Sequence, residues 1–121
     1  MRRVVFERLV QMALRELPLE FRERLDNVQI VIKPEPDAGD LAEAGLDSRS
    51  TLFGLYQGVP QPDRVNYGFN LPDRITLFQG PIERSCRSNW EIRREVRQTV
   101  WHELAHHFGI SDARLDEIGF E

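Results

Sequence analysis

The chain has 121 residues, of which 40% are hydrophobic and 30% are charged, a balance typical of a globular protein rather than a disordered or fibrous one. This length predicts one domain, residues 1–121, with room for a single site and no separate partner module. The formal net charge of −4 argues against nucleic acid as a partner, because the phosphates of nucleic acids bind to basic surfaces.

The cysteine content and the hydropathy pattern limit where the protein can work. Cys86 is the only cysteine, so the sequence has no intramolecular disulfide and no cysteine-based structural zinc site. Arg2 and Arg3 could begin a secretion signal, but charged and amide side chains interrupt the apolar core that such a signal needs. No stretch of the sequence approaches the ~20 apolar residues of a membrane span. We therefore expect a cytoplasmic protein that has no membrane partner.

The first half of the chain predicts two helices and one strand. Apolar residues recur at intervals of three and four over residues 4–17, a pattern that indicates an amphipathic helix. Pro18 interrupts this pattern, and residues 19–25 predict a short second helix. The β-branched run Val28–Lys33 predicts a buried strand. Residues 35–50 are acidic and contain glycine, so we expect a solvated loop with at most one helical turn.

Two further strands are predicted at 52–57 and 74–79, on either side of a stretch rich in glycine and proline. That stretch, residues 58–72, is long for a loop in a compact domain, and long ordered loops often line functional sites. We interpret it as the wall of a cleft, with Tyr56 and Tyr67 as possible contacts. The alternative is that both tyrosines pack on the sheet.

The C-terminal part predicts a short extended piece at 82–84 and then a long helix, Asn89–Phe108. Ser88 and Glu91 have the spacing of a capping box at the start of this helix. Its first half carries three arginines and should be partly exposed, while its second half is apolar around most of its circumference and should be buried. The order of elements predicts an α+β fold with N-terminal helices, a small mixed or antiparallel sheet and a long C-terminal helix.

The long helix contains His-Glu-x-x-His, a spacing with a direct chemical meaning. His102 and His106 project from one face on successive turns, so both imidazoles can reach one tetrahedral zinc ion. Glu103 lies about 100° round the helix from His102, which suits a general base that takes a proton from water. His107 is about 140° from His102, so we expect it to be a surface residue or a neighbour of the ligands. The imidazoles of the motif are expected on a largely buried part of the helix.

A catalytic zinc usually has three protein ligands, so a third must come from outside the motif. Gly109 tolerates the left-handed conformation that ends a helix, after which the chain can fold back. Asp112 is the nearest candidate beyond that turn. Asp116 and Glu117 are its rivals, because they lie in the same tail.

The motif His102, Glu103, His106, Gly109 and Asp112 resembles that of the small single-domain bacterial zincin-like metallopeptidases, His-Glu-x-x-His-x-x-Gly-x-x-Asp. The resemblance extends to the segments at 17–25, 52–56 and 71–78, which together span most of the chain. It implies a minimal zincin-like fold with the motif helix at the active site and Zn²⁺ as cofactor. It also places Asp112 as the third ligand. Metzincins are similar too, but they place a methionine below the metal, and this chain has methionine only at positions 1 and 12.

These observations favour a zinc-dependent peptidase that acts on a peptide or protein substrate, with Glu103 as its catalytic base. In zincins the substrate commonly lies along an edge strand, and the 74–79 segment is our candidate for that edge. The alternative is a zinc-binding scaffold or interaction protein with little or no turnover, which the small size of the chain favours. A metal-dependent nuclease is a third hypothesis, opposed by the acidic charge. The sequence does not indicate an oligomeric state.

Overall fold

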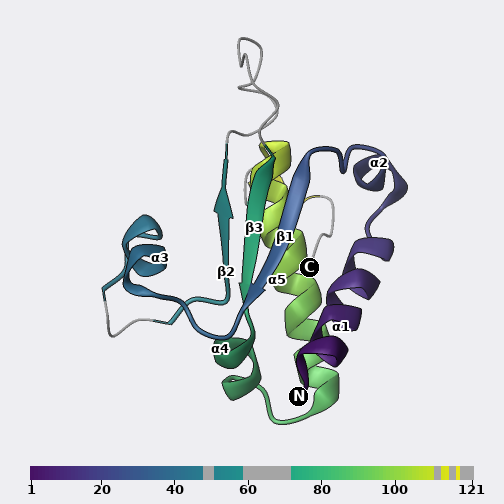
Figure 1. Ribbon diagram of the computed structural model, residues 1–121. Helices are drawn as coiled ribbons and strands as arrows, with labels where there is room; N and C mark the ends of the chain where they lie inside the picture. The colour runs from purple at the N-terminus through teal and green to yellow at the C-terminus, as the bar shows by residue number, and fades with distance from the viewer. Residues whose placement is uncertain (48–50, 59–71, 111–112, 115–116, 118–121) are drawn as a thin grey trace.

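The computed structural model describes residues 1–47, 51–58, 72–110, 113–114 and 117 (Figure 1). Its elements in chain order are α1 (Arg3–Arg15), α2 (Leu19–Arg22), β1 (Val28–Lys33), α3 (Ala38–Glu43), β2 (Gly54–Gln57), β3 (Asp73–Phe78), α4 (Gln79–Arg84) and α5 (Asn89–Phe108). Helices precede and follow the strands of a small sheet along the chain, which confirms the predicted α+β class. None of the described helices is long and apolar enough to cross a membrane.

The three described strands form a mixed sheet in the order β1-β3-β2. β1 pairs with β3 in parallel, in a register that sets Val28 opposite Asp73, and β2 pairs with β3 antiparallel. β3 is therefore bonded on both sides. The expectation that the 74–79 segment is an edge strand is wrong, because a strand with two partners has no row of backbone groups left for a substrate. β2 is an outer strand of the described sheet, on the side away from β1.

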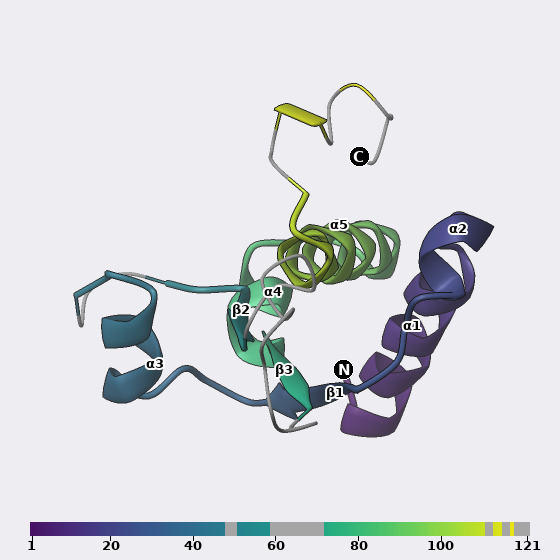
Figure 2. The ribbon, with the colours of Figure 1, turned by 90° about the horizontal axis from the view of Figure 1, so that it is seen from above.

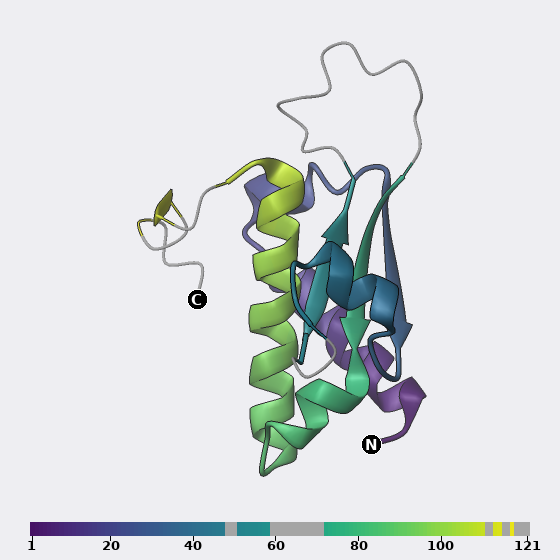
Figure 3. The ribbon, with the colours of Figure 1, turned by 90° about the vertical axis from the view of Figure 1, so that its left-hand side faces the viewer.

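Helices α1 and α5 cover the same face of the sheet, which Figure 2 shows from above and Figure 3 from the side. Their apolar faces and the inward side chains of β3 form one core. Its fully buried members are Phe6 of α1, Ile75 and Leu77 of β3, Ile82 of α4, and Val96, Val100, Leu104 and Ala105 of α5. The Trp101 indole N–H donates to the carbonyl of Ala13 at 2.8 Å, so α5 and α1 are joined by a buried hydrogen bond as well as by packing.

Two short helices differ from the sequence predictions. Residues 82–84 belong to α4 rather than to an extended segment, because Pro81 sits in the first turn of a helix, where its missing N–H is not needed. A Cβ at Gly80 would collide with Glu35, so glycine lets α4 start against the end of β1. Arg84 then donates two hydrogen bonds of 2.7 Å to the Glu35 carboxylate, and this contact lowers the pKa of Glu35.

The predicted helical turn in the acidic segment is the six-residue helix α3. Asp37 caps it, because the Asp37 carboxylate accepts from the Asp40 N–H and the Asp40 carboxylate accepts from the Asp37 N–H. Lys33 at the end of β1 donates to both carboxylates. The N–H of Asp40 and the Lys33 ammonium together lower the pKa of Asp37. An acidic sequence thus forms a local helix beside the sheet rather than a loop alone.

Candidate metal centre

Both ends of α5 are set by local contacts that the sequence predicts. The Ser88 hydroxyl accepts a hydrogen bond of 3.1 Å from the Glu91 N–H, as a helix cap does. The Glu91 carboxylate accepts from the N–H of Arg87 rather than from that of Ser88. The second hydrogen bond of the predicted capping box is therefore shifted by one residue toward the N-terminus. Gly109 ends the helix with a φ of 72°, and the Ile110 N–H returns to the carbonyl of Ala105 at 2.8 Å. The chain can therefore turn immediately after the histidines.

The two motif histidines lie side by side on α5. The ring centroids of His102 and His106 are 5.0 Å apart, and the rings meet at 65°. Both side chains are exposed, with 43% of the His106 side chain accessible to solvent. This exposure corrects the expectation that these imidazoles are buried. Two accessible imidazoles on neighbouring turns can reach a common ion from the solvent side of the helix.

Glu103 points into the space between α5 and β2 rather than into solvent. Only 8% of the residue is exposed, and one carboxylate oxygen lies 3.5 Å from Nδ1 of His106. Gly54 of β2 makes this placement possible. A Cβ at Gly54 would lie 3.1 Å from Cγ of Glu103 and 2.8 Å from Cγ2 of Thr99, too close for an ordinary contact. Glycine therefore allows the outer strand to approach the motif helix.

A cleft of about 410 Å³ opens beside these residues. One wall is α5, including His102 and Glu103, and the other is the chain that leads into β2, residues 51–54. Leu52 and Phe53 give that second wall an apolar surface. The predicted base and one predicted ligand thus line a hollow that a small or extended molecule can enter.

The third predicted ligand, Asp112, lies outside the described residues, as do Asp116 and residues 59–71 of the predicted cleft wall, which include Tyr67. Its other rival, Glu117, is described and forms an ion pair of 3.0 Å with Arg114, in which both side chains are largely exposed. Within the described ranges, no group of three or more His, Cys, Asp or Glu side chains is arranged to hold a metal. The described residues therefore supply two adjacent imidazoles and a carboxylate beside them.

A buried polar network lies directly behind the motif. His107 is completely buried, and its Nδ1 lies 2.7 Å from Oδ2 of Asp73, a residue that is 2% exposed. The Tyr56 hydroxyl donates to the same oxygen at 2.6 Å. Because a carboxylate accepts, the imidazole donates through Nδ1. His107 is thus a neighbour of the predicted ligands and not a surface residue, and one carboxylate joins α5, β2 and β3.

Asp73 was not predicted from the sequence. Its only signal is an aspartate at the start of a buried strand, where an acidic side chain needs a partner. Tyr56 was predicted to contact the cleft or to pack on the sheet, and it is half-buried with its hydroxyl bonded to Asp73. The centre of its ring lies 6.1 Å from that of His106 and 6.4 Å from that of His107, so the tyrosine lies beside both histidines.

Comparison with known proteins identifies the family. The profile of zincin-like metallopeptidases matches residues 25–120, which include every described strand, α5 and the motif. The chain belongs to the zincin-like metallopeptidase family. The fold is also similar to the solved structure of a conserved hypothetical protein from T. thermophilus, with a TM-score of 0.61 and 22% identity over 99% of this chain and 100% of that one. No protein among those with curated descriptions matches the sequence.

The described side chains fit the zinc ion that a zincin-like family implies. Imidazole nitrogen is a common zinc ligand, and here two imidazoles one turn apart face the same side of α5. Ligating histidines usually need a third protein donor and a supporting shell of hydrogen bonds. His102 and His106 are therefore two donors that could hold such an ion, Glu103 lies beside them, and His107 behind them is bonded to Asp73.

Proposed function

We propose that the protein is a zinc-dependent peptidase in which His102, His106 and Asp112 hold the metal and Glu103 is the general base. The observation that carries this proposal is the position of Glu103. Its carboxylate lies beside the two motif imidazoles, is shielded from bulk solvent, and lines the same cleft as His102. A carboxylate in that position can reach a water or a peptide that enters the cleft.

Zinc, when bound, supplies a Lewis acid that polarises the scissile carbonyl and makes water easier to deprotonate. The chain provides the rest. The Glu103 carboxylate accepts a proton from the attacking water while the water oxygen bonds to the carbonyl carbon. Glu103 then gives that proton to the leaving amine as the C–N bond breaks. The shielded position of Glu103 keeps the carboxylate out of competing hydrogen bonds with bulk water.

The substrate that fits this cleft is an extended peptide. β2 is the outer strand next to α5, and its backbone approaches Glu103 closely because residue 54 is glycine. An extended peptide adds to an outer strand through main-chain hydrogen bonds, while side-chain pockets provide selectivity. Leu52 and Phe53 line the cleft, so we expect an apolar substrate side chain beside them.

The decisive experiment compares Glu103→Gln with wild type. Glutamine has nearly the same volume but cannot accept the proton, so cleavage of a broad peptide library should fall by ~10² to 10⁴ while zinc content is unchanged. Glu95→Gln is the matched control. Glu95 lies on the same helix and lines the same cleft, but it accepts a hydrogen bond from Thr99 and is about two turns from His102 and three from His106.

Each outcome assigns a role. Loss of cleavage in Glu103→Gln alone supports the proposal. Wild-type cleavage by Glu103→Gln removes Glu103 from the mechanism. If wild type holds one zinc per chain and cleaves no peptide in the library, the alternative of a zinc-binding interaction protein replaces the peptidase.

A further inference from the structure

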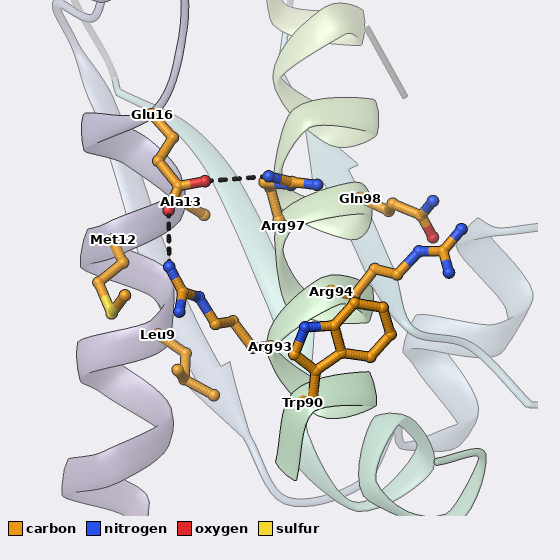
Figure 4. A pocket seen from close by; sticks show the side chains of 9 residues that line it. All are labelled: Leu9, Met12, Ala13, Glu16, Trp90, Arg93, Arg94, Arg97 and Gln98. Carbon is orange, nitrogen blue, oxygen red and sulfur yellow. Dashed lines mark hydrogen bonds and ion pairs between the residues drawn. The ribbon is translucent and has the colours of Figure 1, made fainter. Parts of the chain in front are cut away.

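A second hollow lies between α1 and the first half of α5 (Figure 4). It is distinct from the cleft beside His102 and Glu103, whose other wall leads into β2. It is the larger of the two, at about 630 Å³. α1 lines it with Leu9, Met12 and Ala13, the end of that helix adds Glu16, and α5 contributes Trp90, Arg93, Arg94, Arg97 and Gln98. We call this hollow the arginine groove. Since α1 and α5 lie side by side, the groove has two helical walls (Figures 1 and 4).

The charge of the groove is opposite to that of the chain. Three arginines against one glutamate give its lining a formal charge of +2, whereas the whole chain has −4. Glu16 is shared, because one carboxylate oxygen pairs with Arg93 at 3.4 Å and the other with Arg97 at 3.1 Å. A guanidinium has five N–H donors, so these single contacts leave donors of both arginines available for a further acceptor. The groove is therefore a local positive field on an acidic protein.

The groove also contains an exposed aromatic side chain. Trp90 is 66% exposed, the highest value among the large hydrophobic residues in the described ranges. The guanidinium of Arg94 lies 5.8 Å from the centre of its ring. The Nε atom of Arg97 is buried with no hydrogen-bond partner in the described part of the chain. Exposed tryptophan beside arginine is the composition of binding hot spots between proteins.

We propose that the arginine groove docks an acidic segment of a partner protein, with carboxylates on Arg93, Arg94 and Arg97 and one apolar side chain on Trp90. Charge complementarity selects the acidic partner, and the exposed indole selects a polypeptide that carries an apolar anchor. Two helical walls suit a segment that lies lengthwise between them. Nucleic acid fits less well, because it carries its phosphates beyond the groove over a chain that is acidic as a whole, whereas a short acidic segment stays within the groove.

The position of Gln98 gives this docking a consequence for the metal centre. Gln98 lines both the arginine groove and the cleft at His102 and Glu103. A segment held in the groove therefore ends beside the cleft and raises the local concentration of the residues that follow it. Docking itself requires only the groove, while delivery to the cleft rests on the proposed peptidase function.

The test uses a fluorescein-labelled peptide of glutamates and leucines, with the same peptide carrying lysine for glutamate as its comparison. When the full chain is added, the fluorescence anisotropy should rise for the acidic peptide and not for the lysine peptide. Added salt should weaken the binding of the acidic peptide. Arg94→Glu and Trp90→Ala should each reduce the affinity by roughly tenfold, the scale of a hot-spot residue. Both residues are exposed, and thermal melting verifies that the variants fold.

Two controls separate this proposal from its alternatives. Arg8→Glu makes the same charge change outside the groove and should leave binding unchanged. The second is the readout, because anisotropy reports binding without cleavage, so failure of the peptidase proposal leaves the docking result intact. Absence of acidic-peptide binding, equal binding by Arg94→Glu, or preference for a single-stranded oligonucleotide overturns the proposal.

Discussion

His106 and His107 are consecutive residues with opposite surroundings. His106 has 43% of its side chain in solvent and lies beside His102, while His107 is wholly buried and bonded to Asp73. The difference is one step of about 100° around the same helix. The difference shows that two chemically identical side chains have separate surroundings, one accessible to a metal ion and the other bonded to the sheet through Asp73.

The largest expected effect is on stability, from His107→Ala. This change removes the imidazole donor of the buried Asp73 carboxylate, which costs about 1 to 3 kcal/mol, and it adds the cost of the cavity left by a fully buried ring. Urea unfolding in the presence of a chelator should show this loss. His106→Ala is the matched control and should change the metal-free stability by less than about 1 kcal/mol, because its side chain is exposed. Equal losses of unfolding free energy in the two variants would contradict the different structural roles of His106 and His107.

The next effect is on zinc. His106→Ala removes a proposed ligand, so its zinc affinity should fall by more than the ~10 to 100-fold that accompanies loss of a supporting residue. His107→Asn can still donate to Asp73 from a similar position, and it should keep zinc while His106→Ala loses it. Competition with a chelator measures both. If His107→Asn loses zinc and His106→Ala retains it, His107 is the zinc ligand and His106 is not.

Asp112→Ala tests the third proposed ligand. It should weaken zinc binding by at least ~10-fold, and Asp116→Ala should weaken it less. Glu117→Ala extends the comparison to a residue that already pairs with Arg114. The same chelator competition ranks the three variants. The ligand role passes to whichever position shows the largest loss.

Tyr56→Phe should have the smallest effect of the series. It removes one hydrogen bond to Asp73 and keeps the ring beside both histidines, so we expect a loss of about 1 kcal/mol and unchanged zinc content. Urea unfolding gives the first quantity and metal analysis the second. A loss as large as that of His107→Ala would mean that the tyrosine, not the imidazole, holds the carboxylate in place.

The features of this site that sequence alone predicts are those encoded by neighbours in the chain. The bounds of α5 follow from Ser88, Gly109 and the apolar pattern between them, and β1 follows from a run of β-branched residues. The motif histidines are one turn apart, so their proximity needs no knowledge of the fold.

What sequence did not predict depends on residues far apart in the chain. Asp73 meets His107 across 34 positions, and no local pattern pairs them. The central place of β3 depends on its parallel pairing with β1, which periodicity does not encode. The extended interpretation of 82–84 was wrong because the start of α4 depends on a contact distant in the chain, the hydrogen bond from the Gly80 N–H to the Pro34 carbonyl. The positive charge of the arginine groove was not predicted either, because its lining comes from both α1 and α5, which are far apart in the sequence.

The 34-residue span between Asp73 and His107 also sets an order of events in folding. A helix forms within about a microsecond, whereas pairing β3 with β1 and docking both on α5 must first close long loops. We expect His102 and His106 to be neighbours before Asp73 reaches His107. Zinc present during refolding can therefore act on a nascent helix and change the folding rate, whereas zinc added afterwards meets a finished molecule and leaves that rate unchanged.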